Sequence, residues 1–184
     1  MYQVDATIEG IAKYLYGKWT KEAKKSLQEG TGGGRKSTSD REQEALEKAC
    51  RNNNGLYLPA QDMEACLVQG VKMAKLKEGR SSAAPYVEAT VYVKEREIEF
   101  GKQEPDFLHE ALGKRPPKRG GACIILRPGL NEGWRLSFTL IVTDDRRAPD
   151  LLRRGLEDAG LLVGLGEWRP KYGRFILTKW EVKK

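Results

Sequence analysis

The 184-residue sequence contains one histidine and three cysteines, and it has no long apolar run. The cysteines, Cys50, Cys66 and Cys123, are odd in number and widely spaced, so they predict neither a zinc site nor a disulfide framework. We expect thiols buried in a reducing compartment. No segment reaches the length of a membrane-spanning helix, and the N-terminus lacks the apolar centre of a signal peptide. These absences favour a cytoplasmic protein with no membrane partner.

Recognisable catalytic motifs are also absent from the chain. It has no phosphate-binding P-loop, no nucleophile elbow and no zinc-ligand spacing. Asp144, Asp145 and Asp150 offer carboxylates, but they flank two arginines between a predicted strand and a helix that begins with proline. Turn and capping chemistry explains aspartates in such a place. We therefore expect no enzyme activity, no metal and no cofactor.

What the chain has in excess is positive charge. Its 33 lysines and arginines outnumber 26 aspartates and glutamates, which gives a net charge of +7. This balance favours a polyanionic partner, although many basic proteins are only well solvated. Hydrophobic residues make up 39% of the sequence, as is ordinary for a folded protein. The length suits one core with sizeable insertions, and we expect a single domain over residues 1–184.

The predicted strands share alternation of apolar and polar residues or a high content of β-branched and aromatic residues. They cover Tyr2–Ile11, Tyr86–Val93, Cys123–Arg127, Trp134–Thr143 and Tyr172–Val182.

Two apolar stripes at helical spacing predict helices that pack on a sheet. The first stripe contains Met63, Cys66, Leu67, Gly70, Val71 and Ala74, and the second contains Leu152, Gly155, Leu156, Ala159 and Val163. The order of elements predicts an α+β fold with a ferredoxin-like βαββαβ core, in which two helices cover one face of an antiparallel sheet. RNA-recognition modules share this plan, but their aromatic strand signature is absent here.

Two basic segments interrupt this core. Residues 12–54 contain the flexible run Gly30–Lys36, which is either a linker or a loop that binds a partner, and then a polar helix over Asp40–Cys50. Residues 101–121 are broken by prolines and glycines and carry the cluster Lys114–Arg119, which predicts a projecting hairpin or arm.

A glycine-rich loop follows the last predicted helix, and glycine, cationic and aromatic residues are concentrated in it. Glycines let a backbone approach a ligand closely and expose N–H groups that suit phosphate. A second interpretation is structural, with the glycines ending a helix and forming a turn before a strand. The order of helix, glycines and strand does not fit a dinucleotide-binding loop, which opens a helix. The loop residues are Gly164, Gly166, Trp168, Arg169, Lys171, Tyr172, Gly173 and Arg174.

Three segments of the chain resemble the repeat-associated mysterious protein (RAMP) superfamily. Leu58–Leu67 looks like the "I-P-x-S-x-h-x-G-x-h-R" start of its first helix, and Gly164–Phe175 looks like its C-terminal loop "G-x-G-x-x-R-x-x-G-[FY]-G-R-h". Ala6–Ile11 fits its usual first strand. The whole-chain layout is similar to that of short phage-encoded proteins near the CRISPR effector backbone subunits.

The resemblance implies a protein that binds single-stranded RNA or DNA and polymerises along the strand, alone or with CRISPR-type subunits. In the backbone subunits the helix start and the glycine loop lie near the nucleic acid, and a β-hairpin thumb inserts between nucleotides. Carried over to this chain, the implied contacts fall on Gly164, Gly166, Arg169, Tyr172, Gly173, Arg174 and Gln61. Asp62 departs from the usual small or serine-rich helix start, and its carboxylate disfavours a phosphate at that position.

The predicted nucleic-acid-binding residues therefore come from the glycine loop, the two basic segments and the helix start. Besides the eight loop residues they are Lys114, Arg115, Lys118, Arg119, Arg35, Lys36 and Gln61.

Two alternatives stay open. RAMP-like endoribonucleases that process guide RNA without a metal often use a histidine, and His109 is the one available. The other alternative is a viral interaction protein that mimics or blocks a CRISPR subunit.

Overall fold

The computed structural model describes residues 1–18, 25, 28, 37–114, 122–144 and 149–183. They form an α+β fold with antiparallel sheets, as the sequence predicts. The largest sheet has four strands in the order β12-β1-β11-β7. These are β1 (Tyr2–Gly10), β7 (Val91–Val93), β11 (Arg135–Val142) and β12 (Phe175–Lys183). Strand β1 lies in the middle, paired with β11 and β12 along almost its whole length.

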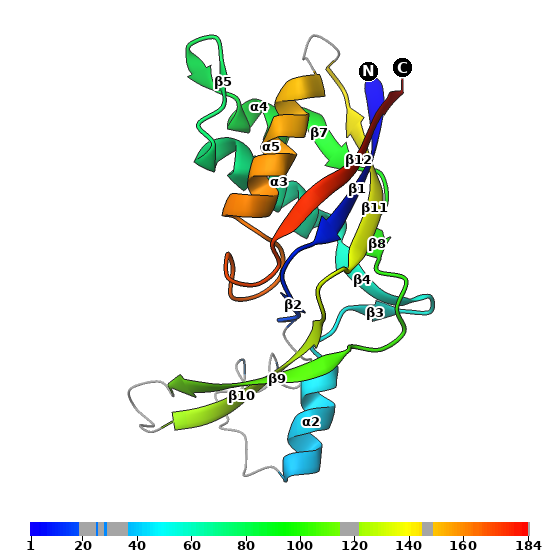
Figure 1. Ribbon diagram of the computed structural model, residues 1–184, viewed down its shortest axis with the longest axis vertical. Helices are drawn as coiled ribbons and strands as arrows, with labels where there is room; N and C mark the ends of the chain where they lie inside the picture. Colours follow the sequence, from blue (N-terminus) through cyan, green and yellow to red (C-terminus); the bar gives the residue numbers. More distant parts are fainter. Residues whose placement is uncertain (19–24, 26–27, 29–36, 115–121, 145–148, 184) are drawn as a thin grey trace.

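Three helices gather on one side of this sheet (Figure 1). They are α3 (Ala60–Met73), α4 (Ala84–Thr90) and α5 (Pro149–Leu162). The close approach of α3 to α5 depends on small residues, because a Cβ on Gly70 would lie 2.4 Å from the Cβ of Ala159. Both apolar stripes predicted from the sequence face this contact, where Gly155 and Leu156 are buried.

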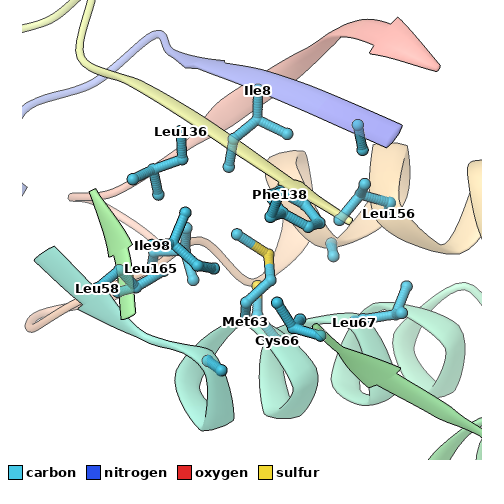
Figure 2. Close-up of a cluster of buried hydrophobic side chains, with 14 of the residues drawn as sticks. Ile8, Leu58, Met63, Cys66, Leu67, Ile98, Leu136, Phe138, Leu156 and Leu165 are labelled. Atoms are coloured by element: carbon cyan, nitrogen blue, oxygen red, sulfur yellow. The ribbon is translucent and has the colours of Figure 1, made fainter. Parts of the chain in front are cut away.

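The core fills the space between these helices and the sheet. Strand β1 alternates strictly between buried and half-buried residues, so that Val4, Ala6 and Ile8 point inward. Figure 2 shows Ile8 above Met63 of α3, with their side chains turned toward the same interior. In the same view Leu165, which follows the last helix, points into this core, and it is fully buried. The core therefore anchors the glycine-rich loop.

A hairpin extends from the end of the molecule opposite the chain termini (Figure 1). Its strands are β9 (Phe107–Lys114) and β10 (Ala122–Leu130), paired in register from Phe107 with Gly129 to Lys114 with Ala122. The short β2 (Tyr14–Leu15) pairs with the base of β10, and α2 (Thr38–Leu46) packs beside the hairpin. The predicted insertion at 101–121 therefore contributes one strand of a longer hairpin.

Small strands complete the fold. Strands β3 (Arg51–Asn52), β4 (Gly55–Pro59) and β8 (Glu97–Glu99) form a three-stranded sheet that leads into α3. Strands β5 (Lys77–Glu78) and β6 (Ser81–Ser82) pair with each other. Within the described ranges, no helix has the length and apolar character needed to cross a membrane.

Two of the predicted strands are wrong in part. Residues Tyr86–Thr90 belong to α4, because Pro85 lies in the first turn of a helix whose buried residues Ala84 and Val87 are three apart and face the core. Only Val91–Val93 continues as a strand. Cys123–Arg127 is extended, as predicted, but it pairs in the hairpin and not in the four-stranded sheet.

Candidate nucleic-acid interface

The glycine-rich loop (residues 164–174, called the glycine loop below) has its shape fixed by its glycines. Gly164, Gly166 and Gly173 all have φ between +74° and +76°, a region that other residues adopt only with strain. At two of these glycines the surrounding backbone also leaves no room for a Cβ atom. A Cβ on Gly173 would lie 1.7 Å from the carbonyl oxygen of Leu165, and one on Gly166 would lie 2.5 Å from that of Leu15. Glycine is therefore required here by the fold.

Backbone amides of the glycine loop are largely used inside the protein. The N–H of Gly164 donates to Ala159, that of Leu165 to Gly173, and that of Gly173 to Lys13. The N–H of Glu167 donates to Leu15 of β2. These bonds match the structural interpretation of the glycines as a helix end and a turn. An anion at this loop would meet side chains and not these amides.

The loop and the hairpin meet through an aromatic cluster, defined here as His109, Trp168 and Tyr172. The ring of His109 lies 5.2 Å from that of Trp168 and 5.4 Å from that of Tyr172, and its Nε2 is 3.5 Å from the Tyr172 hydroxyl. Arg127 is directly opposite His109 in the hairpin register, and its guanidinium lies 5.5 Å from the Trp168 ring. The lone histidine therefore connects two separate elements of the fold.

The glycine loop also borders a cavity of about 430 Å³, called the loop cavity below. Its wall is formed by the segment after β2, by the start of α3 and by the glycine loop. Tyr16 and Lys18 come from the first of these elements, Asp62 from the second, and Glu167 and Arg169 from the third. Charges of both signs therefore surround one hollow.

The carboxyl group of Asp62 is under opposing influences. Partial removal from water raises its pKa, and the nearby positive charge of Arg169 lowers it by less. Among the described residues, the side chains of Asp62, Arg169 and Lys18 make no hydrogen bond or ion pair. The first turn of α3 favours the negative charge of Asp62, since helix N-termini carry partial positive charge.

A buried thiol links two elements near the loop cavity. The Sγ of Cys66 donates to the carbonyl oxygen of Gly164 at 3.3 Å, which links α3 to the glycine loop. Burial raises the pKa of this thiol to about 12, so it stays protonated at neutral pH. Cys66 is therefore a buried structural thiol, as the sequence predicts.

The structure brings together only part of the predicted site. Trp168 and Tyr172 belong to the aromatic cluster, Arg169 lines the loop cavity, and Lys171 lies 6.0 Å from the Tyr172 ring. Gln61 is exposed and lines a separate hollow of about 270 Å³ with Glu64 and Lys72. Lys114 ends β9. Arg35, Lys36, Arg115, Lys118 and Arg119 lie outside the described residues.

Several residues of the site were missed from the sequence. Tyr16, Lys18 and Arg127 approach the glycine loop from other elements, and Tyr57 of β4 lines the cavity. One signal was present, because the run Tyr14-Leu15-Tyr16 is rich in strand-forming residues within a basic segment. No local pattern marks Arg127 or Tyr57.

The open face of the four-stranded sheet differs in character. Its charged side chains are paired with each other, with Arg135 on Glu9 at 2.8 Å and Lys183 bonded to Asp5. Thr7 and Ser137 share a hydrogen bond of 3.0 Å. In the described part of the chain, no group of three histidine, cysteine or acidic residues is arranged to hold a metal ion.

Comparison with known proteins finds solved structures with a similar fold. No protein-family model matches the chain, and no curated protein matches it. Among solved structures, the chain is similar to a chain of the Type III-B Cmr-beta complex bound to cognate target RNA, with a TM-score of 0.50 and 16% sequence identity. The match covers 100% of this chain and 61% of that chain. The likeness at this identity concerns the fold alone. A phage origin stays a prediction.

Proposed function

We propose that this protein binds single-stranded nucleic acid without cleaving it, and that copies of it line up along the strand as CRISPR backbone subunits do. One observation carries the proposal. The aromatic cluster joins a projecting hairpin to the glycine loop, and this loop also lines a cavity whose cations Lys18 and Arg169 make no side-chain hydrogen bond or ion pair among the described residues.

Aromatic rings and cations together are what a single strand requires. Bases stack on aromatic faces, typically with about 1 to 3 kcal/mol per base, and cations follow the phosphates. Trp168 and Tyr172 are half-buried, so part of each ring is accessible, and Arg169 and Lys171 are exposed next to them. A duplex hides its base faces and gains nothing from such rings.

The β9–β10 hairpin has features expected of a thumb that inserts between nucleotides. Leu112 and Ile124 are direct partners in the β9–β10 register, and both are exposed, Leu112 to 81%. Apolar side chains of this kind insert between bases in proteins that unstack nucleic acid. The basic residues Lys114–Arg119 follow immediately in the sequence, so cations accompany the apolar pair.

The similar solved structure favours RNA over DNA as the strand, because that complex is bound to target RNA. The strand order β12-β1-β11-β7 also supports the finer fold assignment, since a βαββαβ chain produces this order when each helix crosses one strand. We take α3 and α5 as those two helices. On this assignment the partners are RNA, other copies of the chain and CRISPR-type subunits.

Fluorescence anisotropy with labelled single-stranded RNA, single-stranded DNA and duplex tests the proposal. We expect single strands to bind more tightly than duplex, with log affinity falling as log salt rises at about 0.7 per phosphate contacted. Equal or tighter duplex binding, or no binding at low salt, contradicts the proposal.

One observation favours a second candidate, metal-independent RNA cleavage. His109 lies within 3.5 Å of the Tyr172 hydroxyl, so a histidine and a tyrosine, both able to transfer protons, meet at the surface. We propose that the pair is structural and leaves RNA intact. Labelled RNA incubated with the protein in chelator should remain full length. Cleavage that His109→Ala and Tyr172→Phe both abolish supports the endoribonuclease instead.

A further inference from the structure

The loop cavity has an unexpected composition for a surface that contacts only phosphates. Two carboxylates, Asp62 and Glu167, line it together with the cations Lys18 and Arg169. A carboxylate repels a phosphate, so it weakens binding unless it meets a hydrogen-bond donor. The mixture suits a ligand that has a negative part and a part rich in donors.

The two carboxylates are not equally available. Glu167 is 3.6 Å from the guanidinium of Arg127, and its side chain packs so closely on Gly17 that a Cβ there would lie 2.0 Å from its Cγ. Asp62 has no hydrogen bond or ion pair within the described ranges. Asp62 is therefore the acceptor left for a ligand.

A buried hydroxyl in the same wall lacks a partner. Tyr16 lines the cavity and is 2% exposed, yet its hydroxyl makes no hydrogen bond with any described residue. Leaving such a group unsatisfied destabilises the folded state, and buried hydroxyls almost always have a partner. The hydroxyl has almost no accessible surface, so Tyr16 offers the cavity its ring and not its hydroxyl.

The remaining wall suits a flat ring. Tyr57 supplies an aromatic ring, and Pro59 and Leu165 add apolar surface. The volume of about 430 Å³ lies in the range of small-molecule sites. A nucleobase has this combination of flat apolar faces and polar edges.

We propose that the loop cavity takes up one unstacked nucleobase of the bound strand and prefers bases with an exocyclic amino group, cytosine over uracil. Asp62 accepts a hydrogen bond from the amino group, and Lys18 and Arg169 contact the flanking phosphates. Uracil has a carbonyl oxygen where cytosine has its amino group, so it would face Asp62 with a second acceptor. This inference rests on the proposed function.

Matched homopolymers test the inference, because oligo(C) and oligo(U) of 12 nucleotides carry the same charge. Anisotropy should show oligo(C) binding at least about fivefold more tightly to the wild-type protein, as one discriminating contact provides. In Asp62→Asn, whose amide both donates and accepts, the ratio should fall to within about twofold. Tyr16→Phe should leave the ratio unchanged, because the hydroxyl is enclosed by the protein.

Asp158→Asn is the matched control. It removes the same charge from α5, where Asp158 pairs with Arg154 and does not line the cavity. This variant should keep the full preference for oligo(C), and circular dichroism should show that all three variants fold. Equal affinities in the wild type, or a preference that survives in Asp62→Asn, overturn the inference and leave strand binding standing. Failure to bind either strand at low salt overturns the proposed function and the inference with it.

Discussion

The open face of the four-stranded sheet and the face formed by the glycine loop and the hairpin differ in what their charges contact. On the sheet, Arg135 and Lys183 are neutralised by Glu9 and Asp5. At the loop, Arg169 has no ion pair among the described residues, and Arg127 lies against the Trp168 ring. A paired surface charge attracts a polyanion weakly, whereas an unpaired one beside aromatic rings attracts it well. Composition alone, at +7, does not separate the two faces.

The largest expected effect is a difference in stability between alanine variants of two glycines with positive φ. Gly173→Ala should destabilise the protein by about 3 kcal/mol or more, because left-handed strain adds to a Cβ placed 1.7 Å from a carbonyl oxygen. Gly133→Ala, in the turn before β11, has φ +86° and open space, so it should lose about 1 kcal/mol from strain alone. Urea unfolding measures both changes. Equal losses would show that the glycine loop relaxes around the added methyl group.

Strand binding should separate the arginines of the two faces. Arg169→Ala and Arg174→Ala should each weaken binding by about 1 to 2 kcal/mol, as expected for cations that contact phosphate, without lowering the melting temperature. Arg135→Ala removes the same charge from the sheet face and should leave affinity almost unchanged. Anisotropy at constant salt gives the three values. Normal binding by both loop variants would mean that the loop is structural only.

Assembly along a strand should depend on the end of the hairpin. Deleting Lys114–Arg119 should reduce cooperativity more than single-site affinity, because neighbouring copies share contacts that one copy lacks. Light scattering on long and short oligonucleotides measures the number of copies bound. A single copy on a long strand at saturation, in the wild-type protein, would rule out assembly.

The smallest expected effect is the pH dependence of a pair on the sheet face. Hydrogen bonds from Lys183 and Thr139 lower the pKa of Asp5 in the folded state. The unfolded chain therefore takes up the proton first as pH falls, and stability from this group is present at neutral pH and lost through the acid range. Asp5→Asn should cost about 0.5 kcal/mol at pH 7 and nothing at strongly acid pH. Thermal melts of the wild type and Asp5→Asn across this pH range test the prediction. If Asp5 acts only through packing, the stability difference between the two proteins will stay the same at acid pH.

Local patterns in the sequence were enough to predict the elements that pack against the core. The alternation in β1 and the stripes on α3 and α5 each record one buried face, and the periods of 2 and 3.6 residues identify the element. The secondary structure of short segments is harder to predict. Val87 and Val91 fit a strand or a helix equally well, and packing of α4 on α3 decided the outcome.

The sequence by itself determined the α+β class, the two packed helices and the need for glycine in the loop after α5. The candidate site was decided only by the tertiary structure. His109 and Tyr172 are 63 residues apart in the chain, and Tyr16, Asp62 and Arg169 come from three separate elements. Periodicity reports which face of one element is buried, but it carries no information on which other element covers that face. The pairing of β10 with β2 and β9 places Tyr16 near the hairpin, and backbone bonds from Glu167 and Gly173 to Leu15 and Lys13 hold the glycine loop against the same segment. All of these are contacts between distant parts of the chain.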